Sequence, residues 1–401
     1  EVNRRFGFEF DLYTTTETKN HSAVSQKIFL GLLANGHLYE ASQSMPYCEI
    51  EKRFLSDRFV EGGCPYCSFD EARGDQCDNC GKILDAHELV NIRCKADGTK
   101  PVFRDTNHYL IKLGDFRDQL ENWVTAQEHW RPQVRNLTLG MLREGLPDRA
   151  ITRDIDWGVA VPVSGYESKR IYVWFEALVG YISAAIEWAS KSGDPDAWKR
   201  WWHNPESRSY YFLGKDNIPF HTIFWPAMLL GYGGIPSYQL PHDVPANEYL
   251  TFEGGKQSTS RNWAVWAHDV LDRYDPDALR YYLTASMPET SDSEFRWQAF
   301  VNRNNDELVA TLGNFIHRVL TMTHRNFGGT VPSPGLLDEQ DNEVLQVCKT
   351  ALKTTAKNIE IVRLRDGLRT VMALAQEGNR YIDKKMPWRT IQTDRNRTAT
   401  T

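Results

Sequence analysis

Four closely spaced cysteines constrain the fold of this chain more than any other feature of its sequence. Cys64 and Cys67 form one Cys-x-x-Cys pair, and Cys77 and Cys80 form a second pair after a gap of nine residues. Each pair can place two thiolates on one side of a tight turn, and two such turns supply the four soft ligands of a tetrahedral zinc site. Two disulfides or four free thiols are the alternative. Because four cysteines leave no open position for water, we expect one structural zinc ion per chain.

The other three cysteines are Cys48, Cys94 and Cys348, and none has a partner at a comparable spacing. We therefore expect them to be bystanders. An odd total of seven cysteines argues against a framework of disulfides. Because secretory features are also missing, the sequence predicts a reducing compartment, the cytoplasm.

Length and charge limit the possible organisation. A chain of 401 residues is too long for one hydrophobic core, so several domains are expected. No run of eighteen apolar residues occurs, which argues against a membrane span. The formal net charge is −6, so any nucleic acid must bind through local basic patches. Because the sequence starts at Glu1 and ends in RNRTATT, we expect a chain that is cut at both ends.

An α/β domain is predicted from strand–turn–helix patterns, of which residues 210–230 are the central example. An aromatic strand is followed by a turn at Gly214, Lys215 and Asp216 and then by a helix with Pro219 near its first turn. In doubly wound folds, ligands bind at the carboxyl ends of such strands. Gly214 would let a ligand approach the backbone, and Asp216 would offer a carboxylate to a ribose.

A second strand–helix pattern contains candidate side chains for a small apolar ligand. Residues 171–178 read as a strand, with Trp174, Ala177 and Tyr181 near its carboxyl end and the start of the next helix. His221 lies about one turn into the helix of the first pattern. Aromatic walls and one imidazole suit a small uncharged side chain. The alternative is that these residues are ordinary members of the core.

A loop rich in hydroxyl groups follows a Gly-Gly pair. It contains Lys256, Ser258, Ser260 and Arg261. Backbone N–H groups and a lysine charge can bind a polyphosphate, although a solvated surface turn would look the same.

Residues 301–401 show helical periodicity almost throughout. Asn314 and Arg318 are four residues apart and so share one helix face. Trp388 follows a proline and lies close to basic residues, which suits stacking on bases of single-stranded RNA. A packed tryptophan beside a solvated run of charges is the alternative.

In this order, the motifs resemble those of the methionyl-tRNA synthetases, a family of class I aminoacyl-tRNA synthetases, over essentially the whole chain. The motifs are the paired Cys-x-x-Cys, YVWFEALVGY, FLGKDNIPFHTIFWPAML, the Lys-x-Ser-x-Ser loop, DPDALRYYL and NRYIDKKMPW. The resemblance implies a partial Rossmann-type catalytic domain with a zinc-binding insert, followed by an α-helical anticodon-binding bundle. The implied divisions are residues 1–40 and 151–247 for the catalytic domain, 41–150 for the insert, 248–300 for the stem-contact region and 301–401 for an incomplete anticodon-binding domain.

The resemblance also implies a methionine–tRNA ligase that uses Mg-ATP to form methionyl-adenylate and then charges tRNA(Met). It assigns Trp174, Ala177, Tyr181 and His221 to methionine, Gly214, Asp216 and Lys256 to ATP, Lys256, Ser258 and Ser260 to catalysis, and Asn314, Arg318 and Trp388 to the anticodon. No membrane partner is implied. The oligomeric state stays open.

Several positions depart from the family pattern. Thr259 stands where the loop usually has a second lysine, for which Arg261 could compensate, and Leu178 and Asn217 also differ from the usual residues. The His-x-Gly-His signature does not occur in these 401 residues, so we expect the chain alone not to form adenylate.

Two other functions were weighed. The synthetases for leucine, isoleucine and valine carry a large editing insert, and the segment between the zinc knuckles and Trp174 is too short for one. A non-catalytic, synthetase-like tRNA-binding paralogue is compatible with the missing signature and with Thr259. A His-x-Gly-His encoded upstream would favour the enzyme.

Overall fold

The computed structural model describes residues 1–56, 58–75, 77, 79–80, 82, 84–234, 237–255 and 263–401. The chain divides into two compact units. One is Phe10–Ala246, and the other combines Glu1–Glu9 with Asn247–Thr401. The five-part division expected from the sequence is finer than this, and it stays a prediction.

The unit Phe10–Ala246 mixes helices and strands. Its helices are α2 (Lys19–Ala34), η1 (Ala86–Glu88), η2 (Leu113–Phe116), α3 (Arg117–Thr125), α4 (Pro132–Glu144), α5 (Val173–Lys191), α6 (Lys199–Trp202), η3 (Lys215–Asn217), η4 (Phe220–Phe224) and α7 (Trp225–Tyr232). Its strands are β1 (Leu38–Cys48), β2 (Arg53–Phe54), β3 (Val60–Gly63), β4 (Ala72–Arg73), β5 (Val90–Cys94), β6 (Val102–Ile111), β7 (Arg149–Ala150), β8 (Thr152–Arg153), β9 (Arg170–Ile171) and β10 (Leu213–Gly214). Strand β11 (Ala246–Asn247) lies at the boundary of the two units.

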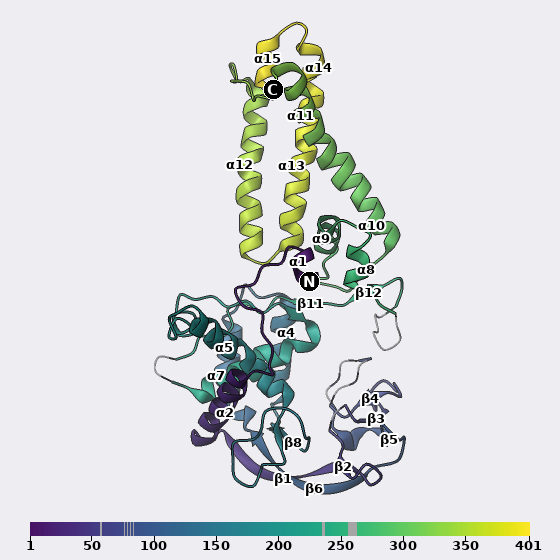
Figure 1. Cartoon of the computed structure of the whole chain (residues 1–401), viewed down its shortest axis with the longest axis vertical. Helices are drawn as coiled ribbons and strands as arrows, with labels where there is room; N and C mark the ends of the chain where they lie inside the picture. Colours follow the sequence, from purple (N-terminus) through teal and green to yellow (C-terminus); the bar gives the residue numbers. More distant parts are fainter. Residues whose placement is uncertain are drawn as a thin grey trace. The chain divides into compact units, whose positions relative to one another are not determined.

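The longest β-ladder of this unit joins β1 to β6. The two strands are antiparallel, with Leu38 opposite Ile111 at one end and Tyr47 opposite Val102 at the other (Figure 1). They form the centre of a sheet with the order β2-β1-β6-β7. Much of β1 is polar and half-exposed, so its backbone pairing with β6, more than an apolar face, holds it in place.

Helices α2 and α5 pack on the main core of the unit. The Thr18 hydroxyl accepts a hydrogen bond from the N–H of His21 at 3.1 Å and caps α2. Phe29 from α2, Ile182 from α5 and Trp225 from α7 are all buried in one cluster.

One strand expected from the sequence is corrected by the structure. Residues 171–178 were expected to be a strand, but α5 already begins at Val173. Aromatic and β-branched residues favour strands locally. Here the segment is helical, because a helix buries Phe175 and Ile182 on one face. Before α5, residues 158–162 form no named strand and make an isolated bridge between Ala160 and Arg170.

A small module carries the cysteine pairs. It contains a three-stranded antiparallel sheet with the order β4-β3-β5. Its buried core contains Cys48, Cys64, Cys77 and Cys94. A few aliphatic side chains, such as Leu55, Val60 and Leu89, complete it. A core this small is weak on its own, which is the usual situation for a metal-stabilised module.

The second unit is mainly helical, as the sequence predicted for residues 301–401 (Figure 1). Its elements are α1 (Val2–Arg5), β12 (Leu250–Phe252), α8 (Ala267–Leu271), α9 (Pro276–Ala285), β13 (Ser293–Phe295), α10 (Trp297–Arg303), η5 (Asn304–Gly313), α11 (Asn314–Phe327), α12 (Glu339–Glu360), α13 (Leu364–Lys385), α14 (Pro387–Thr390) and α15 (Arg395–Thr400). Helix α12 begins with a capping box between Asp338 and Asp341. Among the described residues, no helix has both the length and the apolar character that crossing a bilayer requires.

Candidate functional site

Tyr181 and His221 form the centre of the predicted methionine pocket. Their side chains come from α5 and η4, and the Tyr181 hydroxyl lies 2.7 Å from Nε2 of His221. On the other side of the ring, Nδ1 lies 2.9 Å from the backbone carbonyl of Asn217. Because a carbonyl can only accept, Nδ1 carries the proton, and Nε2 accepts from the Tyr181 hydroxyl.

Burial keeps this imidazole neutral. His221 is buried, and loss of solvation lowers its pKa, although the bond to the Asn217 carbonyl acts in the opposite direction. Burial also raises the pKa of Tyr181. The pair is therefore an uncharged polar group, with Tyr181 still 41% exposed and so open to a ligand.

Aromatic rings surround this pair. Trp174 stacks on Phe220 with 5.0 Å between ring centroids, and Tyr211 meets Tyr181 edge-on at 4.8 Å. The indole N–H of Trp225 donates to the Tyr211 hydroxyl at 3.1 Å and fixes that ring. Trp174, Ala177 and Tyr181 all lie in the first half of α5, so the helix places the predicted methionine residues together.

The turn predicted to bind adenosine is directly linked to this pocket. Gly214 ends β10, and Asp216 lies in the short helix η3 that follows. Both are exposed, and a side chain at Gly214 would meet no other atom within 4 Å, so the surface beside it is open. The same helix η3 supplies the Asn217 carbonyl that orients His221. Because the backbone makes this contact, the unusual side chain at position 217 does not disturb it.

Residues 256–262 are outside the described part of the chain. The expected roles of Lys256, Ser258, Ser260 and Arg261, and the effect of Thr259, therefore stay predictions.

The four cysteines predicted to bind zinc gather in one place. The Sγ atoms of Cys64, Cys67, Cys77 and Cys80 all lie within 4.8 Å of one another. Cys64 is 3.8 Å from Cys80, and Cys67 is 3.6 Å from Cys77. These are thiol separations without a disulfide, and all four are free cysteines. A hydrogen bond from the Asn79 amide is the main cause that lowers the pKa of the Cys67 thiol to about 6. The donor set fits a tetrahedral zinc ion.

The predicted anticodon residues lie in α11 and α14. The Arg318 guanidinium is 5.0 Å from the ring centroid of Trp388, and it is also held by Asp383 at 2.6 Å. Asn314 is exposed in the first turn of α11, four residues before Arg318. Trp388 remains 41% exposed, so its indole ring, which Arg318 holds in place, is available for stacking with a base.

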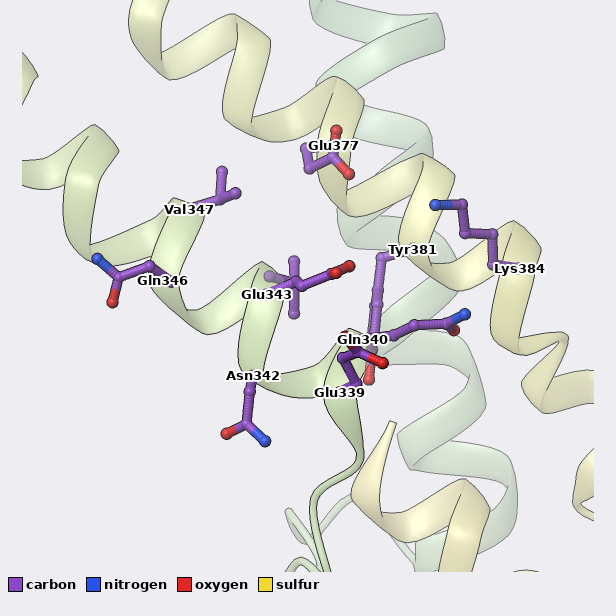
Figure 2. A pocket seen from close by; sticks show the side chains of 10 residues that line it. Glu339, Gln340, Asn342, Glu343, Gln346, Val347, Glu377, Tyr381 and Lys384 are labelled. Carbon is purple, nitrogen blue, oxygen red and sulfur yellow. The ribbon is translucent and has the colours of Figure 1, made fainter.

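A hollow between α12 and α13 is separate from these residues. Figure 2 shows Glu343 and Glu377 facing it from the two helices, with Lys384 at one side. None of the predicted site residues lines it. Its carboxylates make it a poor place for an RNA phosphate.

A buried polar contact near the pocket was missed in the sequence. Nε2 of His21 lies 2.5 Å from Oε2 of Glu176, and Nδ1 lies 2.9 Å from the Ser183 hydroxyl. The contact joins α2 to the segment of α5 that carries Trp174 and Ala177. Glu176 is the one charged residue in the first half of α5, and an acidic residue in an apolar stretch indicates a buried partner.

Cys48 and Cys94, which were expected to be bystanders, lie close to each other, and that expectation stays a prediction. Their sulfurs and a carboxylate oxygen of Asp97 lie within 4.8 Å of one another. Both cysteines are followed at the third position by an acid, Glu51 or Asp97, where the first cluster has a second cysteine.

Comparisons with known proteins cover the whole chain. The family model described as tRNA synthetases class I (M) matches residues 1–320, and the model of the anticodon binding domain of methionyl tRNA ligase matches residues 331–401. A methionine–tRNA ligase of Thermomicrobium roseum is 49% identical over 401 residues, which are 100% of this chain and 68% of that protein. One from Dehalococcoides mccartyi is 53% identical over 391 residues, which are 98% of this chain and 70% of that protein.

Solved structures resemble the fold. Mycobacterium tuberculosis methionyl-tRNA synthetase in complex with methionyl-adenylate matches with a TM-score of 0.79 at 24% identity. The match covers 100% of this chain and 72% of that one.

Proposed function

Because this chain belongs to the methionyl-tRNA synthetases, a family of class I tRNA synthetases, we infer that it acts in joining methionine to tRNA(Met). The identity of 49–53% to methionine–tRNA ligases along 98–100% of the chain carries this conclusion. The methionine carboxylate attacks the α-phosphate of ATP, pyrophosphate leaves, and methionyl-adenylate forms. A hydroxyl of the 3′-terminal adenosine of the tRNA then attacks the methionyl carbonyl, and AMP leaves.

We propose that the methionine side chain binds beside Tyr181 and His221. A thioether is uncharged and polarisable, and it suits aromatic walls such as Trp174. The neutral imidazole, held by the Asn217 carbonyl, presents no charge to an apolar side chain. The half-exposed Tyr181 covers one side of the pocket and keeps its hydroxyl satisfied without the ligand.

The same proposal assigns ATP, with Mg²⁺ as its counterion, to the turn of Gly214 and Asp216 and to the loop of Lys256, Ser258 and Ser260. The carboxylate of Asp216 would accept from the ribose, and the open backbone at Gly214 lets the nucleoside approach. Backbone N–H groups and the Lys256 charge would stabilise the triphosphate as pyrophosphate leaves. These groups act by position and charge, without a covalent enzyme intermediate.

Recognition of tRNA is assigned to Asn314, Arg318 and Trp388. The exposed Trp388 offers a face for a splayed base, while Arg318 fixes that ring and offers hydrogen-bond donors. Zinc at Cys64, Cys67, Cys77 and Cys80 has a structural role, because four thiolates leave no position for a substrate. Free thiols are in keeping with a cytoplasmic location.

The test is a charging assay on the product of the complete gene. It should load methionine, and not leucine, isoleucine or valine, on tRNA(Met). For the 401-residue chain by itself we expect no methionine-dependent ATP–pyrophosphate exchange, because it contains no His-x-Gly-His. Exchange by this chain would contradict that expectation. Anticodon-specific tRNA binding without any charging by the complete product would instead favour the non-catalytic paralogue.

A further inference from the structure

A second hollow of the helical unit is lined by positively charged side chains. It has a volume of about 340 Å³, and its walls come from α9, α10, η5 and α13. Arg303 lines it from the end of α10, and Arg365 and Arg369 line it from the first two turns of α13. Glu307 is the one acidic side chain among the described residues around it. Three positive charges therefore meet one negative charge in this hollow.

The carboxylate of Glu307 is engaged by its neighbours. It accepts a hydrogen bond from the Tyr281 hydroxyl, and Nη1 of Arg303 lies 2.9 and 3.2 Å from its two oxygens. These bonds hold the Arg303 guanidinium at the hollow and use one of its three nitrogens. Because a guanidinium has five N–H donors, Arg303 keeps donors for a ligand.

The two arginines of α13 are held less firmly. Nη1 of Arg365 donates to the backbone carbonyl of Met287 at 3.3 Å. Nη1 of Arg369 lies 3.0 Å from Oδ1 of Asp366, and these two side chains are 70% and 44% exposed. An exposed ion pair adds little stability, so Arg369 can exchange this carboxylate for another anion at little cost.

The hollow is linked to the predicted anticodon residues through one asparagine. Thr311 lines the hollow, and its carbonyl accepts a hydrogen bond from the Asn379 side chain at 2.9 Å. Nη1 of Arg318 in turn donates to Oδ1 of Asn379 at 3.5 Å. Asp383, the other partner of Arg318, follows Arg369 by fourteen residues on α13, which is about 21 Å of helix. A single nucleotide cannot span that distance, so a ligand in the hollow would be a different part of the same RNA.

Positive charge is not spread evenly over α13. The hollow that this helix shares with α12 is lined by Glu339, Glu343 and Glu377, with Lys384 at one side. The arginines line the other hollow. In a chain with a net charge of −6, an RNA backbone requires such a local basic site.

We propose that the hollow of Arg303, Arg365 and Arg369 binds a backbone phosphate of the tRNA, outside the anticodon. A planar guanidinium can donate to two phosphate oxygens at once. Contacts of this kind fix the position of a nucleic acid and carry no sequence information. The site rests on the proposed function in tRNA charging, and it adds a contact that does not depend on the anticodon.

Binding of tRNA by the 401-residue chain at several salt concentrations tests the site. Arg369→Gln should weaken binding and reduce the slope of log Kd against log salt concentration by about 0.7–1, the value for one lost phosphate contact. The loss should be the same factor for tRNA(Met) and for a tRNA with an altered anticodon. Lys353→Gln is the control, because it removes the same charge at an exposed position of α12 that lines neither hollow.

Asp366→Asn tests the site in the opposite direction. It removes the carboxylate that competes for Arg369, so it should tighten the binding of both tRNAs. Glu343→Gln removes the same charge from the other hollow and should have a smaller effect. If circular dichroism shows that Arg369→Gln is not folded, Asp366→Asn decides, and an unchanged Kd in that variant would refute the site.

An unchanged salt slope in folded Arg369→Gln would overturn the proposal, and so would a loss confined to tRNA(Met). Neither result would affect the proposed function, which the charging assay on the complete gene product tests separately. If the unchanged chain bound neither tRNA, the phosphate site and the assignment of the anticodon residues would both fall.

Discussion

The burial of His221 determines how one part of the stability of this protein depends on pH. Burial lowers the pKa of His221 in the folded state below the ordinary value of about 6.5. As pH falls below that value, the unfolded chain takes up a proton at this histidine and the folded chain does not. His221 therefore adds stability above about pH 6.5 that is progressively lost at lower pH.

His221→Gln should make the free energy of unfolding less dependent on pH between about 7.5 and 5.5. The largest slope that one histidine can contribute is about 1.4 kcal/mol per pH unit. Urea denaturation at several pH values measures this pH dependence of the free energy of unfolding. His317→Gln is the control, because His317 is exposed. His108 and His242, whose pKa values burial also lowers, keep part of the dependence in both variants. An unchanged slope in His221→Gln would contradict this account.

At the same scale, Trp388→Ala should weaken the binding of tRNA(Met). Loss of one base-stacking side chain costs about 1–3 kcal/mol, or roughly 5- to 150-fold in Kd. Filter binding against tRNA(Met) and a tRNA with an altered anticodon would show whether the loss is confined to the cognate tRNA. Trp266→Ala is the matched control, because that tryptophan is 40% exposed compared with 41% for Trp388. Equal effects of the two variants would refute the role of Trp388.

Spacing in the sequence predicted the four-cysteine cluster because its ligands are close along the chain. It could not predict that Tyr181 donates to His221, forty residues later, or that His21 meets Glu176. Those contacts depend on how helices pack.

At the scale of elements, a group of charges joins α12, α13 and α15. Asp341, near the start of α12, accepts two hydrogen bonds from Arg397 at 2.5 and 2.6 Å and one from the Tyr381 hydroxyl at 2.6 Å. Its side chain is buried, and Lys385 lies 3.2 Å away. The Arg397 guanidinium is the main cause that holds the pKa of this carboxyl well below its usual range.

Asp341→Asn should destabilise the helical unit by about 3–5 kcal/mol, since the change leaves partly buried cations without their carboxylate. Thermal unfolding followed by circular dichroism measures the effect. Glu343→Gln, an exposed position on the same helix, should change the stability by less than about 0.5 kcal/mol. Similar losses in the two variants would show that the buried charge group is not what joins these helices.

Removal of the zinc ion proposed for the four-cysteine site should affect one module more than the rest of its unit. The core around β3 and β5 has few large apolar side chains, so Cys77→Ser should expose its backbone. Hydrogen exchange should rise in β3 and β5, and remain slow in the ladder of β1 and β6. Cys348→Ser serves as the control. Equal exchange in Cys77→Ser and the unchanged chain would argue that the module folds without metal.

The start of α5 shows why element types were predicted less well than motifs. Val173 to Leu178 have the composition of a strand, but as part of a helix the segment buries Phe175 and Leu178, which are three residues apart. In contrast, the helices of residues 301–401 were predicted correctly from their apolar periodicity. A 3.6-residue pattern that repeats over many turns indicates a helix and fits no strand.

At the scale of the whole molecule, the two units have separate hydrophobic cores. The core of Phe10–Ala246 includes Phe29 and Trp225, whereas Tyr282 and Phe295 belong to a cluster of the other unit. The proposed methionine pocket lies in the first unit, and the proposed anticodon residues lie in the second. A chain with two cores need not unfold in one step.

Scanning calorimetry should therefore show two transitions, and each ligand should shift one of them. An anticodon stem-loop of tRNA(Met) binds only the folded helical unit, so at 100 times its Kd it should stabilise that unit by about 2.7 kcal/mol and leave the other transition in place. Stepwise removal of zinc should lower only the transition of Phe10–Ala246, because all the proposed metal ligands lie in that unit. Trp388→Ala should reduce the shift caused by the stem-loop, while the shift on zinc removal stays the same. A single transition displaced by both treatments would mean that the units are coupled in folding, since binding energy at one would then stabilise the whole chain.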